Sequence, residues 1–202
     1  MSPRKASVAP TQAPRAPSAA AAPPSVPATL RTARLLLRPF QPDDAAAVER
    51  GLAAREVAEQ TLTIPHPYPP GSAATWIGRH AEWYAAGKQA IWAIVHADML
   101  VGAIGLNIVA AHRRAEAGYW IAKDAWGQGI ATEALQAVLA HGFDGLGLHR
   151  IEAMHYVENP ASGRVMQKAG MQREGRLRDV VHRDGVPRTN DLYAMLASDP
   201  RP

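Results

Sequence analysis

The chain has 202 residues, of which 47% are hydrophobic and 20% are charged, and its formal net charge is +4. This length and composition are typical of one globular domain with a core of its own. The sequence contains no cysteine, which excludes disulfides, thiolate metal ligands and a cysteine nucleophile. No apolar run reaches the length of a membrane span and no signal peptide is visible, so we expect a cytoplasmic protein without a membrane partner.

The first 28 residues differ in composition from the rest of the chain. They are rich in Ala, Pro and Ser, carry Arg4, Lys5 and Arg15, and contain no acidic residue. Such a segment cannot bury enough apolar surface to form a core, so we expect residues 1–28 to be a disordered tail and residues 29–198 to be the folded domain. Outside the tail, 19 basic residues face 18 acidic ones. A domain so close to neutral argues against a nucleic-acid partner.

The predicted elements of the first half are a strand, two helices and a hairpin. A strand near residues 30–40 precedes the helix "QPDDAAAVERGLA", which has a proline near its start and acids in its first turn. A proline-rich loop covers residues 61–70, and the next helix begins at Ser72. The segment "QAIWAIVHADMLVGAIGLNIV" divides at Ala97 and Asp98 into two hairpin strands.

The second half alternates more regularly. A strand over residues 115–122, a helix over 130–142, a strand over 149–157 and a short helix over 160–170 are followed by two final strands. The resulting order, β-α-α-β-β-β-α-β-α-β-β, predicts an α+β domain with one mixed sheet and helices on its faces.

The segment "WGQGIAT" joins the strand at 115–122 to the helix at 130–142. Gly127 and Gly129 lie one residue apart just before the apolar helical pattern begins. The first N–H groups of a helix have no partner inside the helix, and the helix dipole is positive there. Glycines without a Cβ let a ligand approach these amides, so the pattern predicts a phosphate site. An ordinary tight turn is the alternative that the glycines alone leave open.

Three blocks in order carry a resemblance to a known family: "AEAGYWI", then "WGQGIAT", then "ENPASGRVMQKAGM". In this order they resemble the GNAT superfamily of acyl-CoA-dependent N-acetyltransferases, and within it the branch of RimJ and RimL, which acetylate ribosomal-protein N-termini. The resemblance covers residues 30–197 and implies a mostly antiparallel central sheet flanked by helices. The family motif begins with Gln or Arg, where this sequence has Trp126.

The resemblance implies that acetyl-CoA is the acetyl donor and that no metal takes part. The glycine turn would hold the pyrophosphate, and the strand before it would pair with the pantetheine through backbone groups. The residues assigned to the coenzyme in this way are Tyr119, Trp120, Ile121, Gly127, Gln128, Gly129, Ile130, Ala131, Thr132, Asn159 and Ser162. Core packing is the alternative role for the Tyr119 and Trp120 side chains.

Two residues are candidates for the chemistry. Many members of the family have a tyrosine that protonates the leaving thiolate, but the matching position here is Met166. Ser162, which the resemblance places near the sulfur, could donate a hydrogen bond instead, or it could only cap its helix. Glu116 matches the position of a carboxylate that often accepts the amine proton through water, or it is a solvated strand residue. An α-amine with a pKa of about 7.8 needs little help from a base, whereas a lysine amine with a pKa of about 10.4 needs much more.

The remaining polar residues carry no motif. The eight histidines lack metal-ligand spacing, and Arg173, Arg176, Arg178 and Arg183 alternate with acids as on a solvated strand face. We therefore predict an acetyl-CoA-dependent enzyme that acetylates an N-terminal α-amine, such as that of a ribosomal protein, by direct attack in a ternary complex. A small-molecule amine acceptor and a non-catalytic acyl-CoA-binding module are the alternatives, and the sequence is compatible with a monomer or a homodimer.

Overall fold

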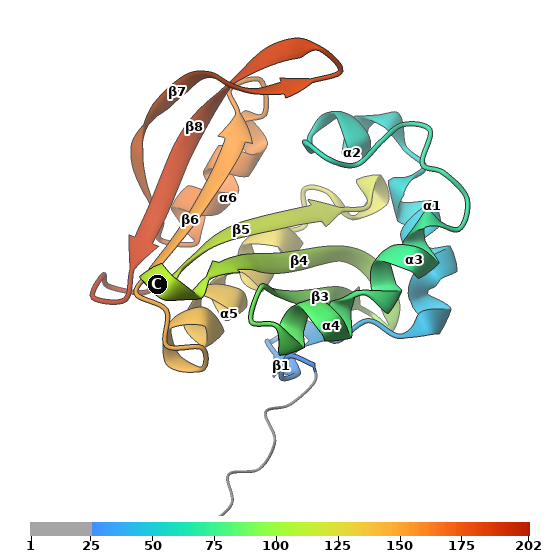
Figure 1. Ribbon diagram of the computed structural model, residues 1–202, viewed down its shortest axis with the longest axis horizontal. Helices are drawn as coiled ribbons and strands as arrows, with labels where there is room; N and C mark the ends of the chain where they lie inside the picture. The colour runs from blue at the N-terminus through green and yellow to red at the C-terminus, as the bar shows by residue number, and fades with distance from the viewer. Residues whose placement is uncertain (1–25) are drawn as a thin grey trace, which may run out of the picture.

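A computed structural model describes residues 26–202, and Figure 1 shows them as one twisted sheet with helices packed against it. The sheet has eight strands in the order β1-β2-β3-β4-β5-β6-β8-β7. All neighbouring strands are antiparallel except β5 and β6, which are parallel. The predicted α+β class, with a single mixed and mostly antiparallel sheet flanked by helices, is confirmed.

The strands are β1 (Leu30–Arg31), β2 (Leu35–Arg38), β3 (Gln89–His96), β4 (Met99–Val109), β5 (Arg114–Ile121), β6 (Arg150–Tyr156), β7 (Gln172–Arg183) and β8 (Val186–Leu196). The α-helices are α1 (Ala45–Leu52), α2 (Arg55–Glu59), α3 (Ser72–Gly78), α4 (His80–Ala85), α5 (Ile130–Asp144) and α6 (Pro160–Lys168). Short 3-10 turns cover Pro42–Asp44, Ala110–His112 and Lys123–Ala125.

Two hydrophobic clusters pack on the sheet. One joins α5 and α6 to the strands through Leu135, Val138 and Met166, each at most 1% exposed. The other joins α1, α2 and α3 around Trp120 of β5. Because successive side chains of a strand point to opposite faces, Trp120 belongs to one cluster and Ile121 to the other. Strand β5 is therefore clamped between both layers, which fixes the segment that leads into the glycine turn.

The structure differs from the sequence-based elements in three places. The expected first strand is two short strands, β1 and β2, which pair antiparallel. The expected helix from Ser72 breaks at Arg79 into α3 and α4, and α2 was not expected at all. Val57 and Ala58 of α2 are fully buried. This helix is thus stabilised by packing against distant residues, which its short local pattern does not reveal.

The predicted tail falls almost wholly on residues 1–25, which lie outside the described residues. The residues that follow contact the domain. Pro27 is buried, and the Ala28 carbonyl accepts a hydrogen bond of 2.8 Å from the indole N–H of the fully buried Trp92. Pro27 and Ala28, which the sequence assigned to the tail, are therefore part of the packed domain.

Candidate active site

Strands β5 and β6 separate soon after they begin. Their pairing covers only Arg114 to Glu116 on β5 and Arg150 to Glu152 on β6. Beyond this point β5 stays paired with β4 and β6 stays paired with β8, so the two strands diverge, as Figure 1 shows. The separation leaves one edge of β5 without a strand partner. An extended ligand with amide groups could add to such an edge as a strand does.

One backbone carbonyl near this edge of β5 already has a hydrogen-bond partner within the protein. The indole N–H of Trp126 donates to the Ile121 carbonyl at 2.7 Å, so this carbonyl is satisfied within the protein. Trp126, the residue that departs from the family motif, thus ties the glycine turn to the end of β5. The side chains of Trp120 and Ile121 are both 8% exposed and pack in the core, which leaves only their backbone for any ligand.

The glycine turn has the backbone conformation that requires glycine. Gly127 and Gly129 have φ angles of +75° and +77°, and Gly129 is the residue immediately before α5. A Cβ on Gly127 would meet no atom within 4 Å, and one on Gly129 would meet only the Arg34 guanidinium at 3.4 Å. The turn is exposed, and the first amides of α5 point toward it without partners inside the helix. This is the geometry of an anion site.

Arg34, which is distant in the sequence, holds the glycine turn in place. Nothing in the sequence around Arg34 indicated this contact. Its guanidinium donates to the Gln128 carbonyl at 3.0 Å and forms an ion pair of 2.7 Å with Glu133 in the first turn of α5. Glu133 also accepts a hydrogen bond from the Thr32 hydroxyl. The β1–β2 turn therefore holds the start of α5 in place.

The start of α6 faces the separated part of β5. Asn159 is the cap of this helix, because its side chain accepts from the Ser162 amide at 3.2 Å, and Pro160 follows it. The Ser162 hydroxyl is not used in capping and instead lies 2.6 Å from the Tyr119 hydroxyl. Burial raises the pKa of Tyr119 to about 12, although the hydrogen bond with Ser162 opposes part of this shift. Met166 is 1% exposed and lies in the core.

Glu116 lies on the opposite face of β5 from Tyr119, because their positions along the strand differ by three, an odd number. It is half-buried in a cleft of about 250 Å³ that is also lined by Trp83, Asn107 and Glu152. Burial and the neighbouring Glu152 carboxylate raise the pKa of Glu116. Arg114 forms its ion pair with Glu152, at 2.6 Å, rather than with Glu116. Glu116 is therefore a carboxylate that no cation within the described residues pairs with.

A family model described as an acetyltransferase (GNAT) domain matches residues 34–172, which is more than half of the chain. The chain belongs to the GNAT acetyltransferase family. The uncharacterized N-acetyltransferase YoaA of Bacillus subtilis (strain 168) is 34% identical over 170 residues, which cover 83% of this chain and 96% of YoaA. A ribosomal-protein-serine acetyltransferase of Escherichia coli (strain K12) is 32% identical over 54% of this chain and 62% of its own length.

Solved structures agree with this assignment. Mycobacterium smegmatis RimJ in complex with a CoA disulfide has a TM-score of 0.74 and 30% identity, with 86% of this chain and 90% of that chain covered. A GNAT-family acetyltransferase from Bacillus anthracis has a TM-score of 0.75 and 26% identity, with 85% and 100% covered. This GNAT protein is an N-acetyltransferase, an acyltransferase that takes its acetyl group from acetyl-CoA.

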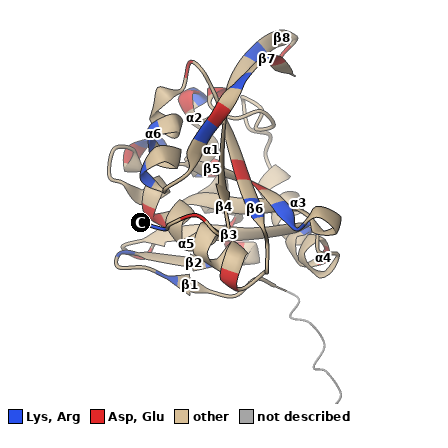
Figure 2. Ribbon diagram, turned by 90° about the vertical axis from the view of Figure 1, so that its left-hand side faces the viewer, with Lys and Arg blue, Asp and Glu red and all other residues tan. Residues whose placement is uncertain are grey.

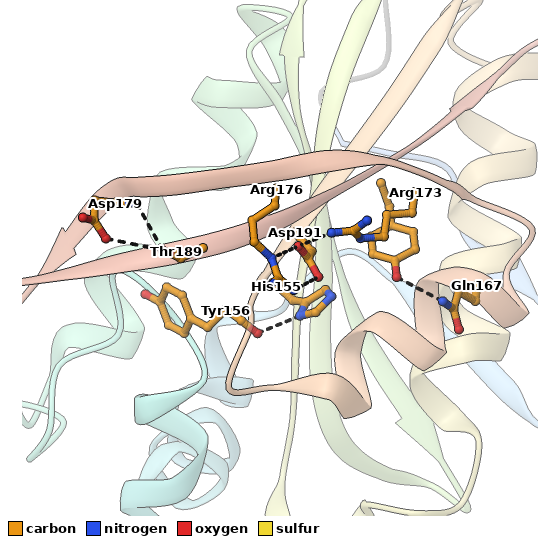
Figure 3. A network of polar contacts seen from close by, with 9 residues as sticks. His155, Tyr156, Gln167, Arg173, Arg176, Asp179, Thr189 and Asp191 are labelled. Atoms are coloured by element: carbon orange, nitrogen blue, oxygen red, sulfur yellow. Dashed lines mark hydrogen bonds and ion pairs between the residues drawn. The ribbon is translucent and has the colours of Figure 1, made fainter.

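The β7–β8 hairpin of this GNAT domain carries a polar network that the expected solvated strand face only partly describes. Arg173 and Arg176 both bind Asp191 at 2.8 Å, as Figure 3 shows, and these hydrogen bonds hold the pKa of Asp191 well below its usual range. Arg183 is only 8% exposed and donates to the carbonyls of Thr61 and Ile64. Arg173, Arg176 and Arg178 are exposed, as expected for a solvated strand face, and Figure 2 shows the charges alternating along the hairpin. The expectation is wrong for Arg183, which is buried and links the hairpin to residues 61–64.

Residues 26–202 contain no group of three or more His, Asp or Glu side chains that could hold a metal ion. The same part of the chain has no helix that is both long and apolar enough to cross a membrane.

Proposed function

We propose that this GNAT enzyme transfers the acetyl group of acetyl-CoA to the α-amine of a protein or peptide N-terminus, by direct attack in a ternary complex. The observation that carries the proposal is the similarity to RimJ over nearly all of the described chain. The printed name of the E. coli relative, a ribosomal-protein-serine acetyltransferase, favours a ribosomal protein as the acceptor.

On the donor side, the amides of Gly127 to Thr132 bind the pyrophosphate, where the positive end of α5 complements its charge. The open edge of β5 from Tyr119 to Ile121 pairs with the pantetheine through its backbone, and Asn159 lies beside it. Because the Ile121 carbonyl already accepts from Trp126, the pairing uses the other backbone groups of this segment.

The attack of the amine nitrogen on the thioester carbonyl forms the C–N bond, and the C–S bond breaks as the thiolate leaves. Ser162 donates a hydrogen bond to the sulfur as negative charge develops on it. A thiolate with a pKa of about 8.5 is a tolerable leaving group, so hydrogen bonding without full proton transfer is sufficient. Met166 has no acidic proton, which leaves Ser162 as the hydroxyl that the motif supplies.

On the acceptor side, Glu116 accepts the proton that the amine loses, directly or through water. Its unpaired carboxylate and its raised pKa suit a base that works near neutral pH. An α-amine with a pKa of about 7.8 is already roughly one-seventh neutral at pH 7, whereas a lysine amine is almost wholly protonated. A single weak base therefore fits an α-amine better than a lysine side chain.

The test is a matched pair of peptides offered to the full chain with acetyl-CoA. Both peptides begin with serine and contain one lysine, but one has a free α-amine and the other is blocked there. We expect thiol release only with the free peptide, and mass spectrometry should place the acetyl group on its first residue. Acetylation of lysine, or faster turnover of a polyamine, would overturn the acceptor assignment. Binding of acetyl-CoA without turnover of any amine would indicate a non-catalytic module.

A further inference from the structure

One hydrogen bond spans the gap between the separated strands. Tyr119 belongs to β5 and Ser162 to the first turn of α6, and their hydroxyl oxygens lie 2.6 Å apart. Both side chains are partly buried. The bond therefore joins β5 to α6, the two sides of the proposed site. It does so at Ser162, the residue that donates to the developing thiolate in the proposed function.

The direction of this bond determines which proton is free. If Ser162 donated to Tyr119, the phenol proton would have to reach the Ser162 carbonyl, which lies 3.4 Å from the Tyr119 oxygen. This distance is outside the usual 2.5–3.0 Å range of O–H···O bonds. If Tyr119 donates instead, its proton lies in the short bond, and the serine proton is free to point elsewhere. The second arrangement satisfies the buried phenol better.

We propose that Tyr119 is a positioning residue that holds the Ser162 hydroxyl as a hydrogen-bond donor toward the thioester sulfur. This inference rests on the proposed function, because it requires the sulfur to lie beside Ser162. Burial raises the pKa of Tyr119 to about 12, so the phenol keeps its proton at every working pH. The phenol is also a much weaker acid than the departing thiol, whose pKa is about 8.5. No net proton transfer takes place, and the two hydroxyls act as consecutive hydrogen-bond donors that polarise each other.

The experiment is a double-mutant cycle with Tyr119→Phe, Ser162→Ala and the double variant, measured with the best amine acceptor found. Tyr119→Phe keeps the aromatic ring and removes only the donor. We expect Ser162→Ala to lower kcat by about 10²–10³-fold, as for the loss of one preorganised donor, and Tyr119→Phe to lower it by roughly tenfold. The KM for acetyl-CoA should change far less in both, because the hydrogen bond strengthens only in the transition state. The double variant should be as slow as Ser162→Ala alone, because Tyr119 acts only through Ser162.

Tyr84→Phe is the matched control, since Tyr84 lies on α4, outside the proposed site. It should leave kcat unchanged. If Tyr119→Phe keeps kcat within twofold while lowering the melting temperature, the tyrosine is only structural and the inference is wrong. Multiplicative losses in the double variant would also overturn it. If Ser162→Ala leaves kcat unchanged, the proposed role of Ser162 is wrong as well. The assay with the free α-amine peptide still tests the acceptor assignment separately.

Discussion

Gly129 and Gly147 have similar backbone conformations in different surroundings. Their φ angles are +77° and +66°, and a Cβ on Gly147 would meet no atom within 4 Å. Gly129 precedes α5, whereas Gly147 lies in the exposed turn that leads into β6. The strain of a non-glycine residue in the left-handed region, about 1–2 kcal/mol, is therefore common to both positions. Only Gly129 adjoins the proposed anion site.

We predict that Gly129→Glu lowers acetyl-CoA affinity by at least tenfold, because a side chain and a negative charge then lie beside the pyrophosphate. Gly147→Glu should leave the affinity unchanged while causing a similar fall in melting temperature. Calorimetric titration of both variants with acetyl-CoA checks this. Equal affinities in the two variants would remove the pyrophosphate from the glycine turn.

At the scale of single residues, the sequence indicated the glycine turn and Asn159. It did not indicate the distant residues whose side chains contact these segments. The glycines were expected there because a missing Cβ leaves room for a ligand; their positive φ angles add a second reason, the conformation of the turn itself. Arg34 braces Gln128 from 94 positions away, and Tyr119 meets Ser162 across 43. Such pairs leave no local pattern, because only the folded sheet brings them together.

Among the elements, the pairing of β4 with β5 holds the segment from Tyr119 to Ile121, to which we assign the pantetheine. Gly102 of β4 pairs with Ile121, and a Cβ there would lie 2.4 Å from the Trp120 carbonyl. Gly118 of β5 is exposed, and a Cβ on it would meet nothing within 4 Å. These two strand glycines therefore differ in their tolerance of a methyl group.

We predict that Gly102→Ala lowers the free energy of unfolding by about 1–3 kcal/mol and weakens acetyl-CoA binding, because the strands must move apart beside Tyr119 to Ile121. Gly118→Ala should be neutral or stabilise by up to about 1 kcal/mol, since it restricts the unfolded chain. Urea unfolding with acetyl-CoA titration measures both effects. A Gly102→Ala variant with unchanged stability and affinity would contradict the close approach of Gly102 to the Trp120 carbonyl.

The elements with a regular spacing of apolar residues were predicted well. The elements that depend on packing against distant residues were not. The helix expected at 130–142 is α5, Ile130–Asp144, whose apolar stripe is buried as its spacing predicts. The hairpin expected at Ala97 and Asp98 is also present, with φ angles of 47° and 61° at these residues. The break at Arg79 was missed because the apolar spacing continues across it from α3 into α4.

For the whole molecule, a partly buried histidine makes stability depend on pH. His80 lies among Phe40, Trp76 and Trp83, and both of its ring nitrogens are buried without a hydrogen-bond partner in the described residues. Burial lowers the pKa of His80 to about 4. Above pH 6.5 the histidine is neutral in both states and has no effect. Below that pH the unfolded chain binds a proton that the folded chain refuses, so stability falls as the pH drops toward 4.

We predict that His80→Phe reduces this loss of stability between pH 6.5 and 4, which is on the order of 2–3 kcal/mol for a shift of this size. His112→Gln, at an exposed position, should keep the wild-type dependence. Urea unfolding at several pH values compares the three proteins. Identical profiles for wild type and His80→Phe would contradict the burial of a neutral histidine.

We propose that acetyl-CoA binds where β5 and β6 separate, with its pyrophosphate on the first amides of α5. Hydrogen exchange of the full chain with and without acetyl-CoA tests this most directly, because the proposed contacts are backbone amides. We expect protection in peptides that cover Tyr119 to Thr132, and little change in the β3–β4 hairpin turn at Ala97 and Asp98. Protection confined to other segments, with none over Gly127 to Thr132, would contradict this placement of acetyl-CoA.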